Sequence, residues 1–212
     1  ECLDDYASGA VFAGLIRLLK YLAFLLSVFG PGLYVMAVAF APEIIPAQLL
    51  TKLAQAEAQT PLPPMLEMLA VTLLLEIVRE AGLRAPQSIS HTVSIVGALI
   101  IGETAVNAGI VSVPVLTMAA AATIATLAVP SLYEQSILFR FCVILLAGLF
   151  GVLGLTCAAL MILAMACGSE PFGYDYLYPL MAPGKASVRD GFVRSIWSEL
   201  AKAGEVIGRH EM

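Results

Sequence analysis

The chain has 212 residues, of which 60% are hydrophobic and 13% are charged, and its formal net charge is −5. Soluble domains usually contain about half apolar and roughly a quarter charged residues, so this composition is that of an integral membrane protein. No basic patch suggests a nucleic-acid-binding protein. The apolar runs approach the roughly 20 residues that a helix needs to cross a bilayer, and they lack the alternation of a transmembrane barrel.

The start of the chain is polar and acidic, and we expect residues 1–17 to precede the membrane domain. The chain begins with Glu1 rather than Met, which favours a longer protein of which these residues are the membrane part. Arg17 and Lys20 stand at the edge of the first apolar run, 18–41, and their charges favour a cytoplasmic amino side. A Gly-Pro-Gly sequence in the middle of that run predicts a kinked first span.

Residues 42–63 predict a short amphipathic helix that lies at the membrane surface and does not cross it. Leucines recur at helical spacing opposite glutamines and a lysine, and Pro46 and Pro61 bound the segment. This is one of the short in-plane helices that we expect.

The next apolar segment, 65–78, is short and contains ionisable groups, beginning with Glu67. A charged side chain at bilayer depth costs at least a few kcal/mol, so such groups need partners, water or an interface. Helical geometry puts Glu76, Arg79 and Glu80 on one side, with Glu76 and Arg79 spaced for an ion pair. Two interpretations stay open: these charges tie the helix to its neighbours or to headgroups, or they line an ion path. We expect this helix to lie in-plane or to re-enter the membrane.

The run 88–108 combines small residues with polar ones. A seam of small residues at intervals of four would let another helix approach closely, and it consists of Ser90, Ser94, Ala98 and Gly102. Near the far end, Glu103 and Asn107 are one turn apart and make the run too polar for full lipid exposure. Glu103 is either a buried structural acceptor or a conduction or proton site.

Two more apolar runs follow, at 110–129 and 141–166. The first contains a block of alanines and favours a packed interior span. The second is the longest in the chain, and we expect it to be a single span. It carries glycines at intervals of three, which predict another face for close helix packing: Gly148, Gly151 and Gly154.

The residues beyond Gly168 predict a surface loop rich in proline and tyrosine, followed by an amphipathic cytoplasmic tail at 184–212. Basic residues gather before the first run and in this tail, so both ends should be cytoplasmic and the number of crossings even. We therefore expect an all-α integral membrane protein with about four transmembrane helices plus short in-plane or re-entrant amphipathic helices. Its helical membrane domain should cover 18–183.

Motifs of the common enzyme classes are missing from the sequence, including a P-loop, HExxH, paired CxxC and GxSxG. The two histidines and four dispersed cysteines do not have the spacing of a metal site or a disulfide framework. We expect no enzyme activity, no metal and no cofactor.

Several phrases resemble the membrane domain of the GerA family, the A-type subunits of nutrient germinant receptors of bacterial spores. They are DDY near the start, EIIPAQLL, PLPPMLEML, LEIVREAGLRAPQSIS, VSIVGALIIGETAVNAGIVSVP and FGYDYLYPLMAP. The resemblance covers about residues 4–183 in order, and REAGLR-x-P and IVGALIIG are its most specific segments. Family members usually carry Gln where Glu103 stands here.

The resemblance implies a subunit of the spore inner membrane that oligomerises into a nutrient-gated cation channel. Such a subunit would follow a soluble cytoplasmic domain and act with a transporter-like B subunit and a lipoprotein C subunit. Stage V sporulation protein AF belongs to the same family, so an accessory role of that type is an alternative. A non-conducting membrane scaffold that joins a nutrient sensor to other germination proteins is another.

Overall fold

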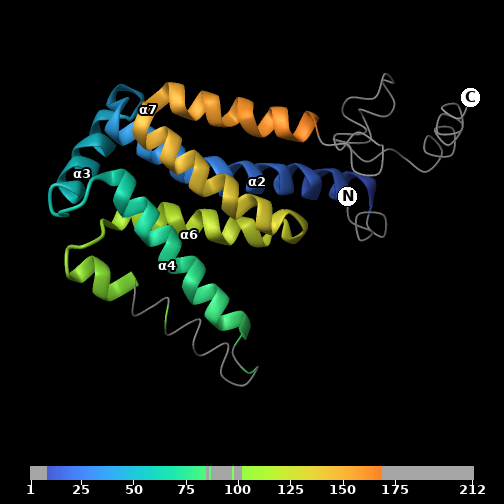
Figure 1. The fold of residues 1–212 in the computed structure, drawn as a ribbon, viewed down its shortest axis with the longest axis horizontal. Helices are drawn as coiled ribbons and strands as arrows, with labels where there is room; N and C mark the ends of the chain where they lie inside the picture. The colour runs from blue at the N-terminus through green and yellow to red at the C-terminus, as the bar shows by residue number, and fades with distance from the viewer. Residues whose placement is uncertain (1–8, 85, 87–96, 98–101, 169–212) are drawn as a thin grey trace, which may run out of the picture. The chain divides into compact units, whose positions relative to one another are not determined.

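A computed structural model describes residues 9–84, 86, 97 and 102–168, and every regular element in this part of the chain is helical (Figure 1). The all-α prediction is confirmed for these residues. The seam residues Ser90, Ser94 and Ala98 lie outside them, as does the predicted tail at 184–212. The elements are α2 (Ala10–Ala39), η1 (Pro42–Ile44), α3 (Ala47–Glu57), α4 (Pro64–Arg84), α6 (Val113–Leu127), η2 (Pro130–Leu132) and α7 (Tyr133–Cys167).

The chain divides into two compact units, Ala23–Leu160 and a second one formed by the two chain ends. All contacts discussed below lie within Ala23–Leu160. Its core consists of side chains from α2, α4, α6 and α7, together with the residue two positions before α6: Val35, Met68, Val71, Val111, Val115, Ala119 and Ile144. Four helices therefore share one apolar centre.

Among the described residues, two stretches of helix are long and apolar enough to cross a membrane, Phe12–Ala39 and Pro130–Cys167. α2 stays one helix through Pro31, so the predicted kink does not interrupt it. The glycine that follows has a packing role, because a Cβ on Gly32 would lie 2.5 Å from Cγ1 of Val143. Because glycine has no side chain, α2 and α7 can approach each other closely at this position.

α4 is longer than the predicted segment 65–78. It covers Pro64–Arg84, which is 21 residues or about 31 Å at 1.5 Å per residue. The apolar segment is the first part of this helix, which continues through the charged residues predicted to share one of its sides. The charges have partners: Glu80 and Arg84 form an ion pair at 2.7 Å on the last turn, and Glu76 contacts α7.

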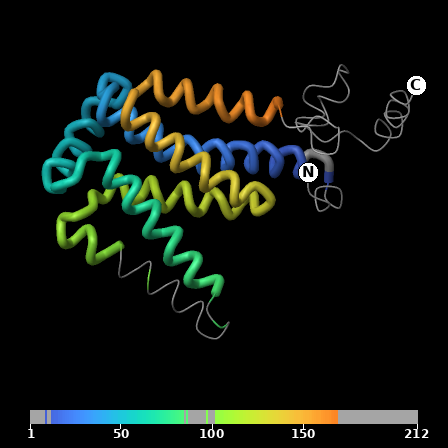
Figure 2. Tube along the Cα trace, in the orientation of Figure 1, coloured from blue at the N-terminus to red at the C-terminus, as the bar shows by residue number. Residues whose placement is uncertain are grey.

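α7 is not one straight helix, so the prediction of a single span over 141–166 was wrong. Gly151 has φ 61° and ψ −131°, which breaks the helix. A Cβ on Gly154 would lie 1.8 Å from the carbonyl oxygen of Leu146, although eight residues of straight helix would separate the two by about 12 Å. The chain reverses here, and Figure 2 shows the yellow and orange arms meeting at an acute bend.

The segment before α6 ends at a left-handed glycine. Gly109 has φ 67°, and the amides of Ile110 and Val111 both donate to the carbonyl of Ala105. Glycine adopts this backbone without the Cβ clash that other residues suffer. The helical stretch before α6 therefore ends here, and α6 starts at Val113.

Candidate functional site

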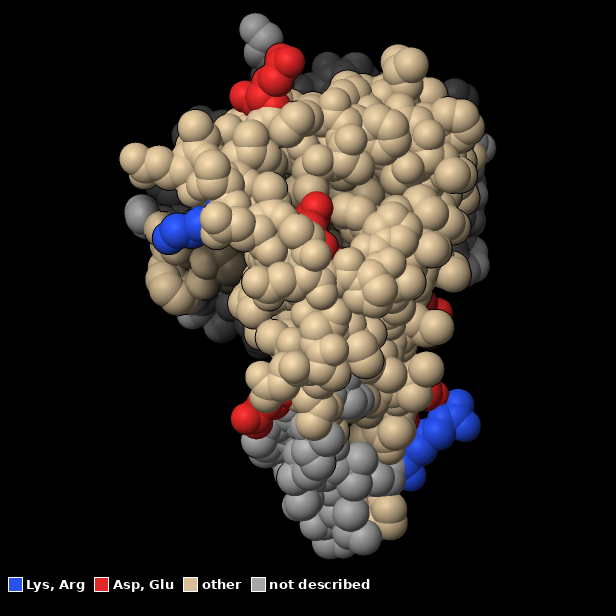
Figure 3. Space-filling model, turned by 90° about the vertical axis from the view of Figure 1, so that its left-hand side faces the viewer, with Lys and Arg blue, Asp and Glu red and all other residues tan. Residues whose placement is uncertain are grey.

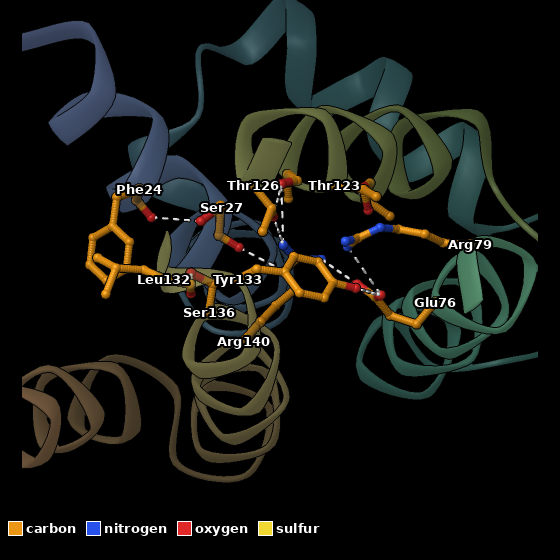
Figure 4. A network of polar contacts seen from close by, with 12 residues as sticks. Phe24, Ser27, Glu76, Arg79, Thr123, Thr126, Leu132, Tyr133, Ser136 and Arg140 are labelled. Atoms are coloured by element: carbon orange, nitrogen blue, oxygen red, sulfur yellow. Dashed lines mark hydrogen bonds and ion pairs between the residues drawn. The ribbon is translucent and has the colours of Figure 1, made fainter. Parts of the chain in front are cut away.

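A buried charge network lies at the meeting point of α2, α4, α6 and α7 (Figure 4). Its centre is Arg140, which has no exposed surface. The guanidinium donates to the carbonyl oxygens of Ser27, at 2.7 Å, and Ala122, at 3.2 Å, and also to the hydroxyl of Thr126. Its Nη1 lies 3.4 Å from a carboxylate oxygen of Glu76. One side chain on α7 thus bonds to three other helices, α2, α4 and α6.

Glu76 connects the arginine to the rest of the network. The hydroxyl of Tyr133 donates to its second oxygen at 2.7 Å. Arg79, one turn along α4, places a nitrogen 3.8 Å from the same oxygen and stacks its guanidinium 3.2 Å from the centre of the Tyr133 ring. α4 is therefore tied to α7 by an ion pair, a hydrogen bond and a cation–π contact.

The network compensates a charge that would otherwise be expensive. A buried ion needs several hydrogen bonds as well as an opposite charge to offset the loss of water. The carbonyl of Ala122 lies near the carboxyl end of α6, where the helix dipole is negative and favours a cation. Two arginines face one glutamate, so the three side chains carry a formal charge of +1.

The structure brings only two of the predicted polar residues into this network, Glu76 and Arg79. Glu80 points to the surface, where it pairs with Arg84. Glu103 and Asn107 are exposed on the helical residues 102–107 and make none of the network's contacts.

The glycines predicted as packing positions lie at different kinds of contact. Gly102 faces Leu116 at an ordinary distance, whereas a Cβ on Gly148 would lie 2.3 Å from Cγ of Met65 on α4. Gly151 lies against Phe40, just past α2, and Gly154 against the backbone of α7 itself. The contacts of Gly151 and Gly154 therefore belong to the chain reversal within this molecule.

Sequence reasoning missed the centre of the network. In the sequence, Arg140 stands directly before the apolar run 141–166, and Tyr133 lies in the polar segment ahead of it. An arginine directly beside a long apolar run is itself a sign of a buried partner, because lipid would not tolerate it. Thr126 gave no such sign, since threonine is common in packed helices.

The described residues contain no group of three His, Cys, Asp or Glu side chains that could hold a metal. The hydroxyls of Tyr133 and Thr126 and the carboxylate of Glu76 all have partners within the network. The network is suited to holding helices together, and it offers no reactive group to a substrate.

The sequence matches a family described as the Bacillus/Clostridium GerA spore germination protein over residues 1–205. The chain belongs to the GerA family. The predicted resemblance is confirmed, and the match extends into the segment 184–212. Together with the two apolar helices, family membership identifies a membrane protein, and one that is not an enzyme.

Three relatives illustrate the similarity. Spore germination protein KA of Bacillus subtilis is 36% identical over 100% of this chain and 39% of its own length. The uncharacterized membrane protein YfkQ of the same species is 33% identical over 93% and 39%, and spore germination protein XA of Bacillus anthracis is 32% identical over 94% and 41%. The chain thus spans about two fifths of the length of these relatives. No solved structure matches it.

Proposed function

We propose that the chain is the membrane part of an A-type germinant receptor subunit that assembles into a nutrient-gated cation channel. The observation that carries this proposal is the exposure of Glu103 and Asn107 on one helical stretch of an otherwise apolar molecule. At membrane depth, such polar side chains need contact with water or with another protein chain. In an oligomer, the helix carrying them, or the neighbouring α6, would face a shared aqueous path.

The rest of the surface supports assembly in or against apolar surroundings. Figure 3 shows a face that is almost wholly uncharged, with only scattered acidic and basic groups. Large apolar side chains on α6 and α7 are exposed, among them Ile124 at 67% and Leu153 at 74%. Lipid tails and other subunits are the two environments that such a surface tolerates.

We also propose on which side of the membrane each part of the chain lies. We place both chain ends in the cytoplasm, with 18–183 as the membrane domain between the segments 1–17 and 184–212. The transporter-like B subunit and the lipoprotein C subunit are the proposed partners, and the spore inner membrane is the proposed location.

Reconstitution tests the channel directly. The purified full-length oligomer is placed in liposomes and potassium flux is measured, for the natural sequence and for Glu103→Gln. We expect the substitution to change the flux and leave the oligomer intact, because it removes a charge from the proposed path. The matched control is Glu43→Gln, an exposed acid on η1 far from 102–107 in sequence. Unchanged flux in Glu103→Gln would exclude this residue from the path.

The second candidate function is a non-conducting scaffold or an accessory subunit of the AF type. It is favoured by the engagement of Glu76 and Arg79 inside the protomer, which removes two of the predicted ion-path residues from any open path. Liposomes containing the assembled oligomer, with nutrient and partner subunits present, would then show no more flux than empty ones.

A further inference from the structure

A second polar cluster lies away from the Arg140 network, where α3 joins α2 to α4. Its members come from four separate segments: Tyr34 from α2, Glu57 from the end of α3, Glu67 from the first turn of α4 and Ser112 from the residue before α6. Neither the sequence motifs nor the proposed channel path accounts for the two carboxylates.

Glu67 is fully buried, yet only one of its two carboxylate oxygens has a hydrogen-bond partner. One oxygen accepts a hydrogen bond from the backbone amide of Ser112, at the amino end of α6, where the helix dipole favours an anion. The other oxygen is buried and has no hydrogen-bond partner. A buried carboxylate oxygen without a partner carries a large desolvation cost, so a ligand or a proton is expected there.

Glu57 lies close enough to Glu67 for the two carboxylates to interact electrostatically. It accepts a hydrogen bond from the hydroxyl of Tyr34 at 3.3 Å. Burial raises the pKa of the Glu57 carboxyl, the Tyr34 hydroxyl opposes this, and the negative charge of Glu67 raises it further. Among the described residues, neither Glu57 nor Glu67 has a lysine or arginine in ion-pair contact. Two acids therefore repel each other without a counter-charge from the chain.

We propose that Glu57 and Glu67, with Tyr34 and Ser112, bind one hard divalent cation of the Ca²⁺ class. The available groups are all oxygens, which such cations prefer, and a flexible coordination shell completed by water suits ligands from four segments. Zinc and similar metals prefer His or Cys ligands, and none of the four residues of this cluster is a histidine or a cysteine. Two carboxylates balance the two positive charges of the ion.

Bound there, the cation would hold α3 against the start of α4 and the amino end of α6. The proposal does not depend on ion conduction, since the cluster shares no residue with the proposed path at Glu103. It would hold equally in a scaffold protein.

The experiment uses the full-length protein in lipid nanodiscs after treatment with a chelator. Binding of radioactive Ca²⁺ is counted, and the unfolding temperature is measured with and without Ca²⁺. We expect about one ion per chain and an unfolding temperature that rises with Ca²⁺, because a ligand that binds only the folded state stabilises it. In Glu57→Gln and Tyr34→Phe the calcium affinity should fall at least tenfold, whereas Glu43→Gln should bind as the natural protein does.

Glu67→Gln is a less clean variant, because it also changes the group that accepts the Ser112 amide and could prevent folding. The result therefore depends on Glu57→Gln and Tyr34→Phe. The proposal is overturned if the natural protein binds no calcium, or if Glu57→Gln binds it unchanged. It is also overturned if lowering the pH stabilises the natural protein while Ca²⁺ at neutral pH does nothing, since protonation alone would then neutralise the pair.

Discussion

Arg140 is the residue on which the helix contacts depend most. Replacing it with Met keeps much of the volume but leaves Glu76 with only Tyr133 and Arg79 as partners. It also removes one donor from each of the carbonyls of Ser27 and Ala122. Removing one member of a buried ion pair usually costs about 3–5 kcal/mol. We expect Arg140→Met to lose about this much unfolding free energy, measured by chemical unfolding in detergent.

The control for this prediction is Arg84→Met. Arg84 also pairs with a glutamate, but its side chain is 81% exposed and that of Glu80 is 57% exposed. Surface ion pairs contribute at most about 1 kcal/mol, so this variant should unfold almost as the natural protein does. Equal losses in the two variants would mean that burial does not set the importance of Arg140.

Glu57 should make stability depend on pH in chelator-containing buffer. Its pKa is raised above the ordinary 4.5 by burial, so the fold favours the protonated form. That contribution is fully present below the unfolded pKa and is lost as the pH rises through the folded pKa. Between pH 4 and 7 the unfolding temperature of the natural protein should therefore fall relative to Glu57→Gln. Parallel curves for the two proteins would contradict the prediction.

The part of the site that sequence could reveal was local. Glu76 and Arg79 are three residues apart, so helix geometry alone suggested their pairing. Arg140 lies 64 residues from Glu76, and its partners on α2 and α6 include two backbone carbonyls. A carbonyl acceptor leaves no trace in the side-chain pattern, so only tertiary packing shows which groups surround Arg140.

At the scale of elements, the reversal of α7 depends on Gly151. Its φ of 61° disfavours any side chain, and a Cβ would also lie 2.7 Å from Phe40. A residue other than glycine in this conformation costs on the order of 1–2 kcal/mol before any clash. We expect Gly151→Ala to lower stability by at least this amount in the same detergent unfolding assay.

Gly9→Ala is the matched control, because nothing lies within 4 Å of the Cβ it would add. It should leave stability unchanged. If Gly151→Ala also left the unfolding free energy unchanged, the prediction would be contradicted. Residue 151 would then tolerate a helical conformation, and the two arms of α7 could form one straight helix.

The wrong prediction of one straight span over 141–166 has a physical cause. Hydropathy joins the two arms of α7, because leucines and glycines on either side of Gly151 are equally apolar. Composition predicts that both arms are helical, whereas the break between them depends on the backbone angles of one glycine.

For the whole molecule, the direction of each helix limits the number of crossings. Contacts place Ser27 by Arg140 and Gly32 by Val143, so α2 and the first arm of α7 run parallel. Because the chain reverses at Gly151, α7 adds two crossings or none. The predicted spans at 18–41, 88–108 and 110–129 alone would make an odd number. Chain ends on one side of the membrane therefore require α4 to cross as well, which gives four crossings, or six if both arms of α7 span.

Cysteine labelling tests whether α4 crosses. In a variant without its natural cysteines, a single cysteine is placed at Gln59, before α4, or at Arg84, at its end; both positions are exposed. With cytoplasmic chain ends, an impermeant maleimide should label position 59 only from outside and position 84 only from the cytoplasm. A cysteine at Gln55 on α3 serves as the control and should behave like position 59. Labelling of positions 59 and 84 from the same side would mean that α4 does not cross and that its charges lie at the membrane surface. The number of crossings would then be odd, which contradicts the prediction that both chain ends are cytoplasmic.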